Sequence, residues 1–331
     1  MSDAAAGSEI RHDPVRGHTT IIAPNRGRRP NAALRPEEAA ITPDVASDPF
    51  LAGNEHLTTE ELFSIRNEAG DWSVRVIRNK YPALTSEASG LISADQVTPG
   101  TGQHEVIVEC PHFETELANL PVEQIGRVLT AWQSRLESIR REGKYDYALI
   151  FKNSGRAAGT SLPHSHSQLI ATAHQFHHIQ AETDRAKQFY LEHSRALLED
   201  TVTRERNSHR VLFEDAGFVA FCPFASRFSH EVWIAGTTVP FHRLSSDSLT
   251  VLGNMLHSVL NAIQSLNPQA AYNILLHATP FSDCEEPWFR WRIEICPRVS
   301  GLAGFELATG CYINSVPPED AARNLRDVLG R

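Results

Sequence analysis

Three polar side chains at alternate positions, His164, His166 and Gln168, are the part of this chain best suited to chemistry. They follow a loop of small residues, 153–163, whose backbone N–H groups can approach a ligand closely. The apolar runs before and after the loop are typical of strands, and residues two apart on a strand share a face. The imidazoles would then lie beside a cradle of phosphate size, which favours attack on phosphorus over attack on carbon.

The residue types in this motif indicate a covalent mechanism. A neutral nitrogen of His166 would attack the α-phosphorus of a nucleoside diphosphate compound, while the backbone carbonyl of His164 holds the proton on the other ring nitrogen. The amide of Gln168 can donate to phosphoryl oxygens without acting as an acid, and Ser161 and the loop N–H groups would share the developing negative charge. A second phosphate-bearing acceptor would then remove the nucleotide. Because the chain has 16 histidines, incidental imidazoles on a surface strand are the alternative, but the order of loop and motif favours catalysis.

The composition argues against several classes of protein. The formal net charge of -9 argues against a general nucleic-acid surface, and no apolar run is long enough to cross a bilayer. Five scattered cysteines without a Cys-x-x-Cys pair are typical of reduced thiols, so we expect a cytoplasmic protein with no nucleic-acid or membrane partner. An acidic chain that binds anions must concentrate positive charge locally. Arg26, Arg29, Arg78 and Lys80 could do so, or could form a solvated basic turn.

The elements that must position the motif recur along the chain. His104-Glu-Val begins a predicted strand, a helical pattern follows at 121–142, and a further strand leads to the motif. His230-Glu-Val opens the same order 126 residues later. The same offset carries the three motif positions onto Arg290, Arg292 and Glu294. We therefore predict two copies of a strand–helix–strand–strand unit, of which only the first keeps the nucleophile.

The domain prediction follows from this repeat. Residues 1–195 would form an N-terminal domain that carries the catalytic motif. Residues 196–331 would form a degenerate C-terminal copy that contributes to substrate binding. A length of 331 residues agrees with about two domains.

The motifs together resemble a known family, the galactose-1-phosphate uridylyltransferases of the histidine-triad-like superfamily, over nearly the whole chain. Residues 11–17 and 24–30 are similar to the opening of that family, and residues 78–83 to its nucleotide-binding turn. Asp48-Pro-Phe50-Leu51-Ala-Gly-Asn54 matches its Cys-Pro-Phe-Cys-x-Gly-Asn segment, and residues 303–314 match its C-terminal substrate strand. His164-Ser-His166-Ser-Gln168 stands where the family usually has His-Pro-His-Gly-Gln.

The resemblance implies a fold, a dimer and a set of site residues. The fold would be α+β, with two histidine-triad-like repeats forming an extended, mostly antiparallel sheet with helices packed on it. Family members are dimers with shared sites, so we expect a homodimer. His166 would be the nucleotidylated nucleophile. The phosphates would be lined by Gln168, Ser161, Gly159 and Asn153, with Arg26 and Arg29 reaching phosphate across the dimer. The nucleoside would contact Phe50, Asn79 and Tyr81, and the hexose would contact Glu306 with Tyr312 nearby.

Two metal sites of the family are altered here. In the structural zinc site, Asp48 and Leu51 replace the two cysteines. The ligands that this chain could still offer are Asp48, His112 and His164. Zinc prefers four ligands in a closed site, so a hydrogen bond in place of the metal is at least as well supported. A second metal site would need histidines where the chain has Arg292 and Glu294, and an arginine there favours an ion pair instead. We expect the chemistry itself to require no cofactor.

The resemblance implies that the substrates are a nucleotide sugar together with a sugar phosphate or phosphate. The first hypothesis is transfer of UMP from UDP-glucose to a hexose-1-phosphate such as galactose-1-phosphate. The motif also resembles the ADP-glucose phosphorylase branch, which transfers AMP to inorganic phosphate. Two further hypotheses are a nucleotide hydrolase, which Gln168 disfavours because such hydrolases usually have a third histidine there, and a non-catalytic nucleotide-sugar sensor.

Overall fold

The structure, a computed structural model, describes residues 8–28, 47–86, 99–174, 176–236, 238–268, 270–283 and 286–331. Its main feature is a ten-stranded sheet in which every pair of neighbouring strands is antiparallel. From one edge to the other the strands are β3 (Glu61–Arg66), β4 (Trp72–Arg78), β5 (Gly102–Val108), β7 (His166–Thr172), β6 (Tyr147–Ser154), β11 (Tyr272–His277), β12 (Arg292–Pro297), β10 (Val232–Ala235), β9 (Phe218–Phe221) and β8 (Val211–Asp215).

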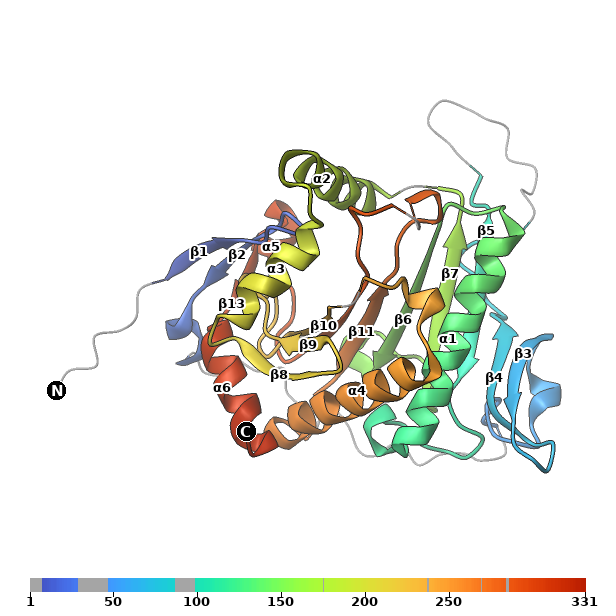
Figure 1. Ribbon diagram of the computed structural model, residues 1–331. Helices are drawn as coiled ribbons and strands as arrows, with labels where there is room; N and C mark the ends of the chain where they lie inside the picture. Colours follow the sequence, from blue (N-terminus) through green and yellow to red (C-terminus); the bar gives the residue numbers. More distant parts are fainter. Residues whose placement is uncertain are drawn as a thin grey trace.

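The strand order of this sheet has a two-fold pattern. The series β5-β7-β6 on one side is repeated as β10-β12-β11 on the other, and β6 and β11 pair at the centre. Each series contains one long helix, α1 (Val122–Glu142) or α4 (Ser246–Leu266), between its first two strands in the chain. Both α1 and α4 lie on the same face of the sheet (Figure 1). The predicted α+β fold and its duplicated strand–helix–strand–strand unit are therefore confirmed.

The two long helices pack closely because small residues meet where they touch. A Cβ added to Gly253 of α4 would lie 3.4 Å from the backbone nitrogen of Gly126 in α1. The buried face of α1 repeats at helical spacing through Ile125, Leu129, Trp132 and Leu136. The indole of Trp132 donates to Ser167 Oγ at 2.8 Å, so the helix is also fixed to β7 by a buried hydrogen bond.

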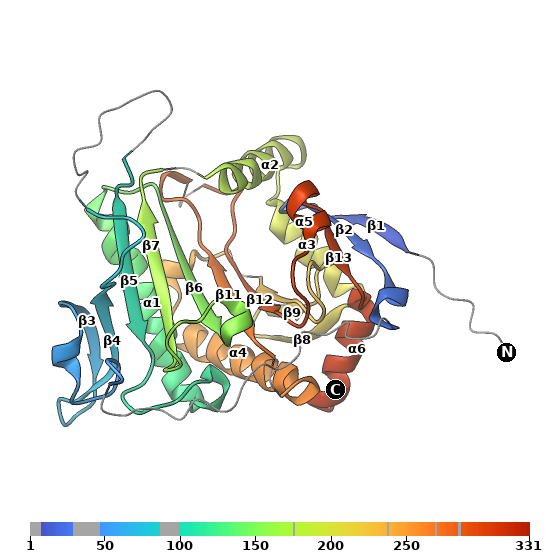
Figure 2. The same cartoon turned by 180° about the vertical axis from the view of Figure 1, so that it is seen from behind.

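The opposite face of the sheet differs between the two copies. Over the second copy it is covered by α2 (His177–His193) and α3 (Leu197–Arg206), whose apolar residues join those of β9 and β10 in a small core. In front of β7 and β6, Figure 2 shows none of the described helices. Alternate residues on this face of β7 and β6, such as Gln168 and Phe151, are only half-buried. The helix α6 (Pro318–Leu329) packs against α4 on the other face.

A separate three-stranded sheet joins the two ends of the chain (Figure 2). It consists of β1 (Glu9–His12), β2 (Thr19–Ile22) and β13 (Tyr312–Asn314), with β13 parallel to β2. The short helix α5 (Gly304–Thr309) precedes β13. The 3-10 turns η1 (Pro24–Arg28), η2 (Glu55–Leu57), η3 (Leu117–Asn119), η4 (Arg156–Ala158), η5 (Phe241–Arg243) and η6 (Phe281–Asp283) connect the main elements.

The structure differs from the predicted strands at two points near the motif and its copy. β7 begins at His166, so His164 lies before the strand and does not share its alternation. β10 begins at Val232, and His230 precedes it with a positive φ of 61°, whereas His104 lies within β5. In both places a turn, rather than a strand residue, is needed to redirect the chain. The boundary between the predicted domains, 195/196, stays a prediction. None of the helices that the structure describes combines the length and hydropathy of a membrane span.

Candidate active site

The His166 imidazole is held in one tautomer by its own backbone. Its Nδ1 lies 2.7 Å from the carbonyl oxygen of His164, and a carbonyl can only accept a hydrogen bond. Nδ1 must therefore carry the hydrogen, which leaves a lone pair on Nε2. Burial lowers the pKa of His166 to about 4, so the ring is neutral at physiological pH. The arrangement supplies what a nitrogen nucleophile needs, and it uses the carbonyl that the sequence indicated.

Phe50, from the segment before β3, covers one side of His166. Phe50 is buried, and its ring centroid lies 5.2 Å from that of His166 and 6.0 Å from that of His164. It packs with Val106 and Val108 of β5, which neighbour β7. Phe50 therefore lies beside His166, and its contact with a nucleoside stays a prediction.

A buried ion pair lies directly beside the nucleophile. Lys152 Nζ donates to Glu109 Oε2 at 2.7 Å, to Ser165 Oγ at 2.9 Å and to the carbonyl oxygen of His166 at 3.2 Å. Ser165 Oγ also donates to Glu109 Oε2 at 2.6 Å. Lys152 and Glu109 are fully buried, because both side chains are at most 1% exposed. Sequence reasoning did not select these two residues, although a lysine directly after the apolar run 147–151 signals a buried partner.

Gln168 lies on the same face of β7 as His166 and is hydrogen-bonded to His104. The sequence analysis identified His104 only as the start of a repeat. His104 Nε2 lies 2.8 Å from Gln168 Oε1 and 3.1 Å from Asn79 Nδ2. Asn79 Oδ1 in turn accepts from the backbone N–H of Tyr81 at 2.8 Å. Asn79 and Gln168 are thus both in contact with the same residue, His104. The Tyr81 side chain is 82% exposed and contacts solvent rather than the site.

The small-residue loop begins where β6 ends, beside β11 of the second copy. Gly155 and Gly159 both have positive φ, 80° and 96°, which favours glycine, and a Cβ on Gly155 would lie 2.7 Å from Ala271 Cβ. Asn153 Oδ1 accepts from Asn273 Nδ2 at 2.8 Å. Ser161 is exposed farther along the loop. Asn153 and Gly159 are neighbours, since a Cβ on Gly159 would lie 3.7 Å from Asn153 Nδ2.

The residues expected to retain a zinc site make a hydrogen-bonded arrangement instead. His164 Nδ1 lies 2.7 Å from Asp48 Oδ2, and His164 Nε2 lies 3.0 Å from the carbonyl oxygen of Cys110. Each ring nitrogen therefore lies within hydrogen-bond distance of an oxygen atom. Among the residues that the structure describes, Asp48, His112 and His164 do not form a cluster with metal-ligand spacing. In this arrangement the three side chains do not fit a zinc ion.

The corresponding part of the second copy is a buried network of opposite charges. Arg292 donates to Glu182 at 2.5 and 3.1 Å and to Glu294 at 2.8 Å, so the ion pair expected at Arg292 is present. Arg16 also donates to Glu294, at 2.9 Å to each oxygen. Burial alone would raise the pKa of Glu294, but Arg16 and the other nearby cations hold it well below its usual value.

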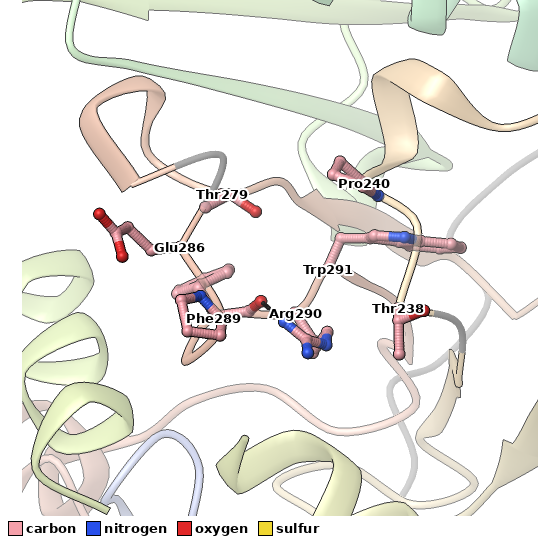
Figure 3. A pocket seen from close by; sticks show the side chains of 8 residues that line it. Thr238, Pro240, Thr279, Glu286, Phe289, Arg290 and Trp291 are labelled. Carbon is pink, nitrogen blue, oxygen red and sulfur yellow. Dashed lines mark hydrogen bonds between the residues drawn. The ribbon is translucent and has the colours of Figure 1, made fainter. Parts of the chain in front are cut away.

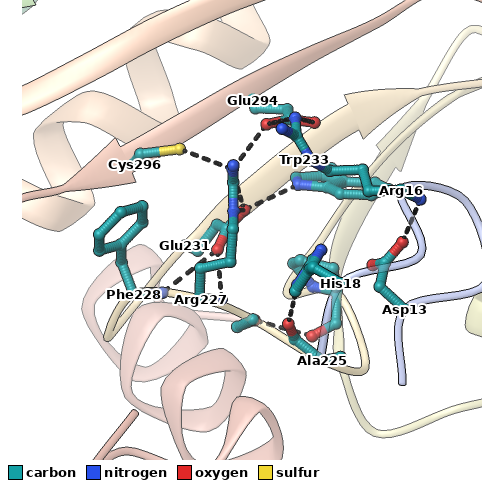
Figure 4. Close-up of polar contacts among 12 residues, drawn as sticks. Asp13, Arg16, His18, Ala225, Arg227, Phe228, Glu231, Trp233, Glu294 and Cys296 are labelled. Carbon is teal, nitrogen blue, oxygen red and sulfur yellow. Dashed lines mark hydrogen bonds and ion pairs between the residues drawn. The ribbon is translucent and has the colours of Figure 1, made fainter. Parts of the chain in front are cut away.

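One group in this network, Glu231, Glu294 and Cys296, has metal-ligand spacing, but an arginine already fills it (Figure 4). Arg227 Nη2 lies 2.7 Å from Glu231, 2.6 Å from Glu294 and 3.2 Å from Cys296 Sγ. A guanidinium at this point repels a metal cation and donates hydrogen bonds to the same oxygen and sulfur atoms.

Three other predicted site residues lie on or beside the three-stranded sheet, apart from His166. Arg26 belongs to η1 after β2 and is exposed. Glu306 Oε2 accepts from the N–H of Ala303 at 3.1 Å at the start of α5, and Tyr312 in β13 packs against His18 and Phe228. Within the described part of the chain, the recorded contacts of these three residues do not reach β7. Arg29 lies outside the described residues.

The second copy contains a cavity of about 240 Å³ (Figure 3). Its lining segments correspond to those that follow β5 and β6 in the first copy. Thr238 and Pro240 come from the segment after β10, as Pro111 and His112 follow β5. Most of the other lining residues come from the β11–β12 connection, which corresponds to the β6–β7 loop. There Arg290, at the position that corresponds to His164, donates to Glu199 at 2.6 Å. The position that corresponds to His166 is Arg292, which is held by Glu182 and Glu294.

Comparison with known proteins agrees with this geometry. Residues 1–175 match the family model "Galactose-1-phosphate uridyl transferase, N-terminal domain". The chain is 32% identical over 329 residues to the ADP-glucose phosphorylase of Arabidopsis thaliana, covering 97% of this chain and 93% of that protein. It is 24% identical over 336 residues to the galactose-1-phosphate uridylyltransferase of Thermotoga maritima, covering 96% and 98%.

Solved structures give the same result. The Arabidopsis thaliana ADP-glucose phosphorylase with bound ADP-glucose superposes with a TM-score of 0.84 at 31% identity, over 97% of this chain and 99% of that one. A uridylyltransferase structure superposes with a TM-score of 0.75 at 25% identity, over 97% and 98%. With a match to the family model over more than half its length, and similarity to two members over nearly all of it, the chain belongs to the galactose-1-phosphate uridylyltransferase family.

Proposed function

We propose that this protein is a nucleotidyltransferase that transfers AMP from ADP-glucose to inorganic phosphate through His166. The observation that carries the chemistry is the neutral, buried imidazole whose Nδ1 is bonded to the His164 carbonyl. The choice of substrate is supported by the 32% identity to a protein named ADP-glucose phosphorylase, against 24% for a uridylyltransferase of similar coverage.

The reaction has two steps. His166 Nε2 attacks the α-phosphorus of ADP-glucose, a P–N bond forms, and the P–O bond to the β-phosphate breaks, so that glucose-1-phosphate leaves. A phosphate oxygen then attacks the same phosphorus, the P–N bond breaks, and ADP leaves while the electron pair returns to Nε2. Gln168 has no titratable proton, which suits transfer to phosphate better than activation of water. Its amide would instead bind the phosphoryl oxygens.

Uridylyl transfer to a hexose-1-phosphate is the second candidate, and it uses the same nucleophile. It is favoured by the match of residues 1–175 to the family model, whose description names that activity. The two candidates differ in base and acceptor, so they are separated by experiment rather than by the position of His166.

The test is intact-protein mass spectrometry after incubation with ADP-glucose and, separately, with UDP-glucose, without acceptor. We expect an AMP adduct that is absent in His166→Ala and is discharged by added phosphate. A UMP adduct that is discharged by galactose-1-phosphate would support the second candidate. An adduct that persists in His166→Ala would contradict the assigned nucleophile, and release of free AMP without an adduct would indicate hydrolysis.

A further inference from the structure

The two amide side chains of the site, Gln168 and Asn153, can bind phosphate with only one of their ends. A carboxamide oxygen accepts hydrogen bonds, and its NH₂ group donates them. A phosphoryl oxygen needs a donor, so an amide with its oxygen toward the substrate would repel it. The orientation of each amide is therefore a functional property, and it must be set by whatever holds the opposite end.

The orientation of Gln168 follows from His104. The backbone N–H of Ala83 donates to His104 Nδ1 at 3.1 Å, so Nδ1 carries no hydrogen and Nε2 must carry one. Nε2 has two neighbours, Gln168 Oε1 at 2.8 Å and Asn79 Nδ2 at 3.1 Å. Because only Gln168 offers an oxygen, the hydrogen bond runs from His104 to Gln168 Oε1. The NH₂ group of Gln168 is then directed away from His104.

The orientation of Asn153 follows from Asn273 by the same reasoning. Asn273 Nδ2 lies 2.9 Å from the carbonyl oxygen of Ala158, which can only accept, and Asn273 Oδ1 lies 3.2 Å from Arg298 Nη1, which can only donate. The Asn273 amide therefore has one possible orientation. Its NH₂ group also donates to Asn153 Oδ1 at 2.8 Å, so Asn153 directs its own NH₂ away, toward Gly159 in the small-residue loop.

We propose that His104 and Asn273 are positioning residues that hold the oxygens of Gln168 and Asn153, so that both amides present only N–H donors to the phosphates of the substrate. The proposal rests on the proposed nucleotidyl transfer. His104 belongs to β5 of the first copy, whereas Asn273 belongs to β11 of the second. The second copy, which lacks a nucleophile, thus contributes to the site by orienting a donor of the first.

The experiment is a double-mutant cycle on each pair, read from the single-turnover rate at which the nucleotide adduct forms on His166. His104→Phe removes the donor and keeps a flat ring, and Asn273→Leu removes the amide at similar size. We expect each to lower the rate about tenfold or more, as loss of an aligned donor to developing charge does. In the Gln168→Ala background His104→Phe should have no further effect, and Asn273→Leu should have none in the Asn153→Ala background.

Controls separate positioning from a structural role. His104→Gln keeps an N–H donor and should recover most of the rate, and it also serves as the test if His104→Phe does not fold. His257→Phe, on α4 across the sheet, should leave the rate unchanged. If the single substitutions slow adduct formation by the same factor whether or not the partner amide is present, the proposal is overturned.

Failure of the proposed function gives a different result. If the wild-type protein forms no adduct, the same cycles are measured as the Kd of ADP-glucose by calorimetry. Non-additive losses of affinity would then support the positioning role while rejecting transfer. Additive losses, or no binding by the wild-type protein, would reject the positioning role as well.

Discussion

The proposed role of His166 requires two properties of its ring. A good nitrogen nucleophile must be neutral, and its attacking nitrogen must be the one without a hydrogen. Burial supplies the first property and the His164 carbonyl supplies the second. Neither depends on a neighbouring acid or base, in contrast to nucleophiles that are activated by proton transfer.

A pH profile of the first half-reaction should reveal this environment. Protonated His166 has no lone pair to attack with, and its pKa of about 4 lies below the usual value of 6.5. The rate of adduct formation with ADP-glucose should therefore be flat from about pH 6 to 8 and should fall as pH drops toward 4. Stopped-time mass spectrometry, with circular dichroism to verify folding, provides the measurement. A midpoint near 6.5 would mean that the ring is solvated.

At the scale of elements, the site depends on three adjacent strands and a buried ion pair. Lys152 of β6 joins Glu109, which follows β5, to Ser165 and His166 at the start of β7. The family's usual His-Pro-His sequence has no hydroxyl at the position of Ser165, so this chain adds a hydrogen bond there. The ion pair therefore connects β6 and the end of β5 to the start of β7, from which His166 projects.

Removal of one charge of this pair should be costly. Lys152→Met leaves the Glu109 carboxylate buried without a counter-charge, so we expect a loss of about 3–5 kcal/mol in the free energy of unfolding. The double variant Lys152→Met/Glu109→Gln should lose much less, because no isolated charge remains. Urea unfolding measures both. Lys144→Met, whose side chain is 70% exposed, is the matched control and should change stability by less than about 0.5 kcal/mol. An equal loss in the single and double variants would show that packing, rather than charge, is responsible.

At the scale of the whole molecule, the two copies have diverged on the same framework. β7 begins with His166, and β12 begins 126 residues later with Arg292, but the first copy leaves its face half-buried while α2 and α3 cover the second. Arginine side chains fill the covered face with ion pairs.

Metal removal should therefore leave the fold unchanged. Among the described residues, the group with metal-ligand spacing is filled by Arg227, and each nitrogen of His164 lies within hydrogen-bond distance of an oxygen atom. We expect the melting temperature to be the same with and without a strong chelator, as measured by differential scanning calorimetry. A drop of several degrees in chelator, reversed by added zinc, would contradict the hydrogen-bonded interpretation of Asp48 and His164.

A shared site in a homodimer would explain why Glu306 lies in α5, beside the three-stranded sheet and apart from His166. If Glu306 serves the site of a partner, His166→Ala and Glu306→Ala are each inactive alone. Mixed dimers would then contain one intact site, and a mixture after subunit exchange should recover up to about a quarter of wild-type activity. No recovery, from variants that exchange subunits, would place Glu306 and His166 in one chain's site or remove Glu306 from it.

The sequence by itself determined the family and the duplicated unit, and it singled out the motif of His164, His166 and Gln168. These are local or periodic properties: small residues before alternating polar ones, apolar spacing along 121–142, and an offset of 126 that the starts of β7 and β12 reproduce. Tertiary structure alone decided which groups surround the motif. The hydrogen bonds from His104 to Gln168 and from Asn273 to Asn153 span 64 and 120 residues, and Lys152 to Glu109 spans 43. Sheet pairing creates such contacts, and no spacing along the chain encodes them. Arg227, from the loop between β9 and β10, likewise contacts Glu294 and Cys296 of β12 across 67 and 69 residues.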